Sequence, residues 1–139
     1  MSDARATRAS GPSLTAGGTI IPMRAIKLDT TAEYTALAAG AGDKMIGVAP
    51  PYQKRAPGLT GSDTDIAAES GDQLDYYGPG DVAPVVAGAA ISIGANVKAS
   101  TSGKVVTATT GWVGGIAMTA ANADGDVVYV WLQSPYYIA

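Results

Sequence analysis

The sequence predicts a mainly β domain, built either as a small barrel or as a sandwich. Short apolar segments alternate with Gly, Pro, Asn and Asp residues that favour turns, most clearly in residues 85–139. Residues 127–133 (VVYVWLQ) show the period of two that is typical of a β-strand. The 139 residues include 26 Ala and 18 Gly but no Phe, so each buried side chain removes little apolar area from water. A chain with so thin a core gains from burial against other subunits.

The first strands follow an N-terminal segment of different character. Residues 1–18 are small, polar and interrupted by Gly and Pro. Because such a segment cannot bury enough surface to offset its ordering entropy, we expect a flexible arm there and a single β domain over residues 19–139. One or two short strands are expected in residues 19–28. Pro22 should lie at an edge or a bulge, since proline cannot donate to a ladder.

The central part of the chain contains a long predicted loop. Residues 33–39 (EYTALAA) fit either a strand or a short helix, and residues 44–49 (KMIGVA) predict a strand that ends at two prolines. Residues 50–73 are rich in Pro, Gly, Ser and Asp and predict a long surface loop. Residues 73–77 and 81–86 flank Gly-Pro-Gly, which predicts a hairpin.

Further strands are expected in the C-terminal half, around residues 91–97, 104–108, 111–118 and 127–133. Both faces of the last of these are apolar, so the face turned away from the core should be covered by another layer or a neighbouring subunit. Gly47 and Gly115 occupy equivalent positions in two similar segments, where a strand bends or another backbone approaches closely.

Composition excludes several kinds of catalytic site. The sequence has no His and no Cys, which removes Ser-His-Asp and Cys-His nucleophiles, imidazole ligands, thiolates and disulfides. The acidic residues of the predicted loop do not match a calcium-binding loop, because Ile66-Ala67-Ala68 follows Asp63-Thr64-Asp65 where further ligands are required. No metal, cofactor or catalytic residue is therefore predicted, and the protein is expected not to be an enzyme.

Charge is divided unevenly between the two parts of the chain. Residues 1–55 carry seven basic and four acidic groups, and residues 56–139 carry two and eight, giving +3 and −6. The basic groups are sparse and not interleaved with aromatic residues, so nucleic-acid binding is not expected. No apolar run is long enough to cross a bilayer and no secretory signal begins the sequence, so no membrane partner is expected.

Several segments resemble the phage capsid cement or head decoration proteins. Residues 85–132 are similar to the order of turns and strands in that family, and GDKMIGVAP (42–50) resembles its first Gly-containing strand. The matching positions in the C-terminal half are Gly88, Ile91, Gly94, Val97, Gly103, Lys104, Val105, Ile116, Ala117, Ala120, Ala123, Gly125, Asp126, Val128, Val130 and Leu132. The resemblance implies a small β-barrel or bent-ribbon domain (β-clip or β-tulip-like), similar to that of lambda-like head decoration proteins.

The resemblance also implies a function. Such proteins assemble as homotrimers on the outer surface of the expanded head and bridge subunits of the major capsid protein. The virion, after synthesis in the host cytoplasm, is then the expected location. The residues expected to bind the capsid through the arm are Arg5, Arg8, Leu14, Ile20 and Ile21. The residues expected at the subunit interface are Tyr129, Trp131, Tyr136 and Tyr137.

Two alternatives remain open at this point. A virion surface or fibre module could bind host glycans through residues 50–73 and exposed Tyr and Trp side chains, although Trp112 and Trp131 are at least as compatible with a core role. A calcium-dependent hydrolase fragment is the third reading, and it depends on the acidic loop.

Overall fold

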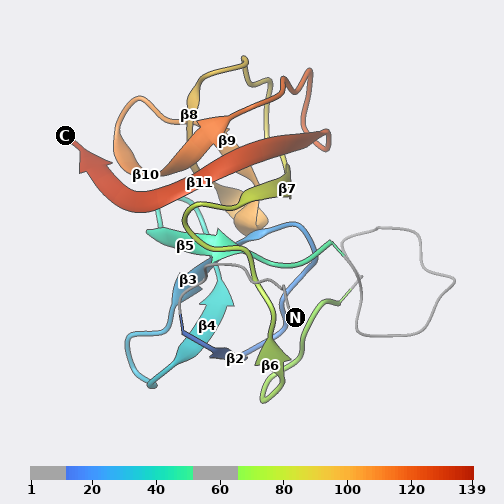
Figure 1. The fold of residues 1–139 in the computed structure, drawn as a ribbon, viewed down its shortest axis with the longest axis vertical. Coiled ribbons are helices and arrows are strands. Elements are labelled where there is room, and N and C mark those ends of the chain that lie inside the picture. The colour runs from blue at the N-terminus through green and yellow to red at the C-terminus, as the bar shows by residue number, and fades with distance from the viewer. Residues whose placement is uncertain (1–11, 52–65) are drawn as a thin grey trace, which may run out of the picture.

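Two five-stranded sheets make up the fold in the computed structural model, which describes residues 12–51 and 66–139 (Figure 1). The N-terminal sheet contains β2 (Leu14–Ala16), β3 (Ala25–Leu28), β4 (Thr35–Ala38), β5 (Met45–Val48) and β6 (Gln73–Leu74). The C-terminal sheet contains β7 (Val82–Val86), β8 (Asn96–Ala99), β9 (Val105–Thr107), β10 (Gly111–Ala117) and β11 (Val127–Ile138). The 3-10 turn η1 (Thr101–Gly103) joins β8 to β9. The prediction of a mainly β domain is confirmed.

The C-terminal sheet is antiparallel, with strand order β7-β11-β10-β8-β9. An isolated parallel bridge between Ala87 and Val105 links the end of one edge strand to the other edge strand, so the sheet curls on itself. The two sheets do not form a closed barrel. Of the two predicted architectures, the structure corresponds to two packed sheets and not to a closed barrel.

The N-terminal sheet has strand order β5-β3-β4-β2-β6 and mixes parallel with antiparallel pairs. Its strand β2 pairs in parallel with β4 and antiparallel with β6. Leu14 on β2 is 2% exposed, so residues 14–16 belong to the folded domain and the prediction of a free arm over residues 1–18 is wrong for this part. The cause is long-range pairing, since Leu14 lies opposite Leu74. Residues 1–11 lie outside the described residues.

Two further expectations, the hairpin across residues 78–80 and the long loop over residues 50–73, are corrected by the structure. The predicted hairpin would consist of β6 and β7. These strands flank a tight turn, in which Gly78 N donates to the Asp81 carboxylate at 3.0 Å and Asp81 N donates to Gly78 O at 3.1 Å. They then enter different sheets, so the predicted hairpin of residues 73–77 and 81–86 does not form. The end of the predicted loop is also structured, because Ala68 is buried and pairs with Ile20. Residues 52–65 of that loop lie outside the described residues.

The larger core cluster joins the two sheets, and it is rich in alanine. It contains 16 buried residues, seven of them Ala, and draws Ala25, Ala39, Met45 and Val48 from the N-terminal part of the chain. A separate cluster of eight buried residues lies within the N-terminal sheet and its connections, and four of those are Ala. Small side chains let the backbones approach closely, at the expense of apolar area buried per residue.

The close approach is most evident at glycines. A Cβ added at Gly47 would meet the carbonyl oxygen of Tyr77, and one added at Gly115 would lie 2.6 Å from the carbonyl oxygen of Trp131. A Cβ at Gly114 would overlap the side chain of Met45, which comes from the other sheet. The prediction that another backbone approaches Gly47 and Gly115 is confirmed.

A substitution at Gly115 tests this packing. Gly115→Ala is expected to lower the free energy of unfolding by about 1–3 kcal/mol, because the added methyl group meets backbone that cannot move cheaply. Gly18→Ala is the matched control: no atom lies within 4 Å of its added Cβ, so the change should stay within about 0.5 kcal/mol. Urea unfolding followed by tryptophan fluorescence measures both, and equal stability of the two variants would contradict the packing argument.

A second test concerns the turn between β4 and β5. Gly40 N donates to the Asp43 carboxylate at 2.8 Å, and this hydrogen bond, helped by Lys27 Nζ at 3.1 Å, holds the pKa of Asp43 below its ordinary value of 3.8. Because the folded-state pKa is the lower one, the stabilisation is present above pH 3.8 and is lost as the pH falls through the folded-state value.

We therefore expect Asp43→Asn to lower the free energy of unfolding at pH 7 by about 0.5–1 kcal/mol, a modest value because the side chain is about one-third exposed and screened by solvent. The difference from the unchanged protein should shrink as the pH is lowered from 7 toward 3. Urea unfolding at steps of pH measures it. A difference that does not change with pH would show that the carboxylate charge has no role in this turn.

Candidate interaction surfaces

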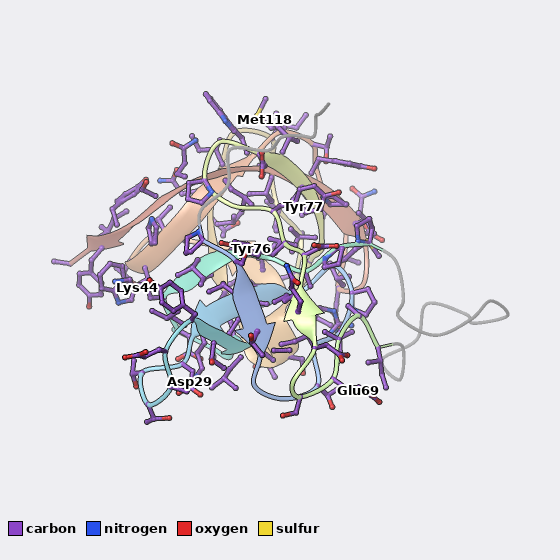
Figure 2. The ribbon with its side chains drawn as sticks, turned by 60° about the horizontal axis from the view of Figure 1, so that its bottom comes forward. Asp29, Lys44, Glu69, Tyr76, Tyr77 and Met118 are labelled. Atoms are coloured by element: carbon purple, nitrogen blue, oxygen red, sulfur yellow. The ribbon has the colours of Figure 1, made fainter. Side chains whose placement is uncertain are left out.

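The strongest candidate surface is the outer face of the C-terminal sheet, defined here as Val82, Pro84, Val86, Ile116, Met118, Val127, Tyr129 and Trp131. Strand register aligns these side chains in rows: Trp131 lies between Val82 and Ile116. Tyr129 lies opposite Pro84 and accepts a hydrogen bond from Met118 N at 2.8 Å. Figure 2 shows Met118 on the side of this sheet that is turned away from the N-terminal sheet.

The outer face is apolar and open to solvent. Five of its eight side chains are between 42% and 50% exposed: Val82, Met118, Val127, Tyr129 and Trp131. None of the eight carries a charge. Monomeric proteins seldom expose large apolar side chains in contiguous rows, and such rows mark surfaces that other molecules cover.

The opposite face of β11 shows why these residues remain outside. Val128 and Val130 are fully buried and Leu132 is 2% exposed, so every second residue points into the core. The prediction of two apolar faces on this strand is confirmed, with one face buried and the other uncovered. Tyr129 and Trp131 were predicted from the sequence as interface residues, but their neighbours on β7, on β10 and just after β10 were not. The alternating segment VAPVV (82–86) carried that signal.

Tyr136 and Tyr137 lie elsewhere, on an extension of β11 beyond its contact with β7. Here β11 pairs only with the start of β10, after a register shift between Val113 and Gly115. Tyr137 is 62% exposed and packs edge-to-face on Trp112, with ring centroids 5.3 Å apart. Lys44 Nζ lies 4.8 Å from the centroid of the Trp112 ring. These aromatic residues form a second cluster, and the expected chain-end segment is part of a paired strand.

The outer edge of β7 is closed to strand addition. The backbones of Asp81 and Ala87 both face β11. Leu132 N donates to Asp81 O, and Ala87 N donates to Asp126 O, just before β11 begins. By the alternation of an antiparallel ladder, the backbone of Pro84 faces the open edge, where proline has no N–H to offer. Val86 N, on the same side, donates to Met23 O at 3.0 Å. A partner therefore meets side chains of the outer face rather than a free ladder.

The residues predicted to bind a capsid through the arm are not brought together. Leu14 and Ile20 are 2% and 0% exposed in the smaller core cluster, so their predicted role in direct contact is wrong. Ile20 N donates to Ala68 O at 2.8 Å, which fixes it inside the domain, and Ile21 is half-buried. Arg5 and Arg8 lie outside the described residues.

Within residues 12–51 and 66–139, no group of three or more acidic side chains is placed to hold a metal ion. The same part of the chain contains no helix of the length and apolarity needed to span a membrane.

Comparison with solved structures finds a similar fold. The chain superposes on the N base of the head fiber gp8.5 of bacteriophage phi29 with a TM-score of 0.50, at 16% sequence identity, over 91% of this chain and 96% of that one. At this identity the likeness shows a shared fold. No protein-family model matches the sequence, and no curated protein matches it.

The assignment of the two faces of the sheet can be tested with one isosteric change. Val130→Thr places a hydroxyl in the core without a prepared partner and should lower the free energy of unfolding by about 1–3 kcal/mol. Val82→Thr makes the same change at a half-exposed position of the outer face and should alter it by less than about 0.5 kcal/mol. Both are measured by urea unfolding, and an equal loss in the two variants would mean that the outer face is already covered.

Proposed function

We propose that this protein is a non-enzymatic structural component of a phage head, a decoration or cement protein. In this proposal it binds the outer surface of the expanded head and stabilises it by bridging subunits of the major capsid protein. The observation that carries the proposal is an uncharged, exposed outer face on a fold shared with the base of a phage head fiber.

Self-association through the outer face is the first part of the proposal, with a homotrimer as the expected assembly. Burial of apolar surface contributes about 25 cal/mol per Å², and rows containing Tyr129 and Trp131 supply the large side chains that dominate protein interfaces. The protein's own core is made largely of Ala and Val, so contact between copies would add stability that each copy lacks.

Attachment to the shell is the second part. Because Leu14 and Ile20 are committed to the core, the arm that is proposed to reach the capsid is shorter than residues 1–18 and contains Arg5 and Arg8. Many identical copies on one lattice would hold through multivalency even where each contact is weak.

A role in glycan binding has less support. Lys44 Nζ lies over the Trp112 ring, and the two residues opposite Trp131 on the neighbouring strands, Val82 and Ile116, offer no polar side chain to sugar hydroxyls. Neither tryptophan therefore presents a prepared sugar platform.

Self-association is tested by sedimentation velocity. The unchanged protein should sediment as a trimer, and Tyr129→Glu should shift it to monomer, because a charge would be buried in the interface. Leu28→Glu, at an equally exposed position on the N-terminal sheet, is the control and should leave the trimer intact. A specific interface is expected to have a dissociation constant of about 1 μM or lower. A protein that is still monomeric at about 100 μM would therefore contradict this part of the proposal.

Attachment is measured on heads of the phage that encodes the protein. Purified protein is mixed with undecorated expanded heads and with procapsids, and the bound copies are counted after sedimentation. Saturable binding to expanded heads that is lost on deleting residues 1–11 is the expected result. Absence of binding together with a positive glycan array would replace the proposal with the glycan-binding alternative.

A further inference from the structure

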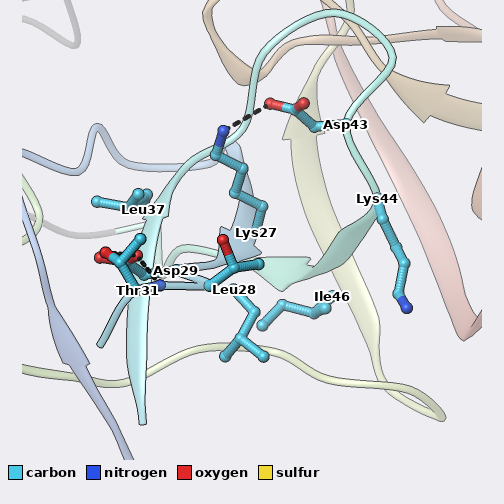
Figure 3. A pocket seen from close by; sticks show the side chains of 9 residues that line it. Lys27, Leu28, Asp29, Thr31, Leu37, Asp43, Lys44 and Ile46 are labelled. Carbon is cyan, nitrogen blue, oxygen red and sulfur yellow. Dashed lines mark hydrogen bonds and ion pairs between the residues drawn. The ribbon is translucent and has the colours of Figure 1, made fainter. Parts of the chain in front are cut away.

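A pocket of about 620 Å³ lies on the N-terminal sheet, away from the outer face (Figure 3). It is bounded by β3, β4 and β5 and by the turns that follow β3 and precede β5. Its volume falls within the range of pockets that hold a small ligand or a few residues of a peptide.

The middle of the pocket is apolar. Leu28, Leu37 and Ile46 line it from three adjacent strands. Leu28 is 48% exposed, and the other two are half-buried. A ligand with an aliphatic group would therefore remove from water apolar surface that the fold itself leaves uncovered.

The ends of the pocket carry opposite charges. Lys27 forms an ion pair with Asp43 at 3.1 Å and acts on Asp29 only through the weaker attraction of a more distant charge. Asp29 and Lys44 are therefore the charged groups of the pocket that have no ion pair among the described residues (Figure 3). The Asp29 carboxylate is oriented by Thr31, whose Oγ1 and N donate to it at 2.7 and 2.8 Å, and these bonds lower the pKa of Asp29. Lys44, at the other end, is held over Trp112.

We propose that this pocket binds an extended polypeptide segment of a partner protein, in which an aliphatic side chain lies between a basic and an acidic residue. The aliphatic group occupies the space over Leu28 and Ile46, the basic residue pairs with Asp29, and the acidic residue pairs with Lys44. Two charges of opposite sign at separate ends match a zwitterionic peptide better than an anionic membrane surface, which would require several cations on one side.

This inference goes beyond the proposed function and does not depend on it. The pocket residues and the outer face belong to different sheets, so a variant can change one surface and spare the other.

The test uses the full chain labelled with ¹⁵N and the blocked peptide Ac-Gly-Lys-Leu-Glu-Gly-NH₂. Titration followed by NMR should shift the amide signals of residues 28–31, 37 and 44–46. Replacing the leucine of the peptide by serine should weaken binding about tenfold through the loss of apolar burial. Exchanging its two charged residues for serine should weaken it by a similar factor.

Protein variants locate the site. Leu28→Glu should abolish the shifts by placing a charge in the apolar middle, and Lys44→Gln should weaken binding several-fold while leaving the fold unchanged. Val82→Glu on the outer face should bind the peptide as the unchanged protein does, even if it prevents self-association. Shifts that are absent, that spread over the whole surface, or that persist in Leu28→Glu would overturn the proposal.

Discussion

The close contact between the two sheets is the constraint on which the rest of the structure depends. Met45 reaches from the N-terminal sheet over Gly114, and a Cβ added at Gly103 would lie 2.9 Å from the Cβ of Arg24 and 3.0 Å from the carbonyl oxygen of Ala25. Arg24, itself 5% exposed, donates from Nη1 to Ser102 O at 3.0 Å across the same junction. A side chain at either glycine would force these neighbouring atoms to shift, in the region where the larger cluster of buried residues joins the two sheets.

The aromatic rings of the outer face lie away from this contact. The cluster that joins the sheets is mostly Ala and Val, and the one ring packed against it, that of Tyr77, is only partly buried. Tyr129 and Trp131 lie on the face of β11 that points away from this cluster. The edge of the same sheet is blocked at Pro84, which prevents uncontrolled pairing of strands while the side-chain face stays available. Exposed apolar rows beside a closed strand edge favour association through side-chain packing. Such packing fixes how the partner is oriented, whereas backbone pairing at an open edge would allow several registers.

The features that depend on neighbouring residues in the chain were predicted from the sequence. The alternation in residues 127–133 located β11 and both of its faces, and the glycines of two similar segments marked the close approaches. Prediction failed where the outcome depends on residues far apart in the chain. Leu14 looked like an isolated apolar residue in a polar arm, yet it lies opposite Leu74, and the next two residues of its strand pair with β4. Gly-Pro-Gly at 78–80 does form a turn, but which sheet each flanking strand joins is decided by β2 and β11.

The pocket escaped sequence analysis for the same reason, since Leu28, Leu37 and Ile46 are adjacent only after β3, β4 and β5 pair. Its position matters for a protein proposed to bridge subunits, because bridging requires at least two surfaces that can be occupied together. The outer face is on one sheet and the pocket on the other, so neither occupant needs to displace the other. The rigid junction between the sheets would then hold the two occupants at a fixed separation, which is the mechanical property that a clamp on an expanded shell requires.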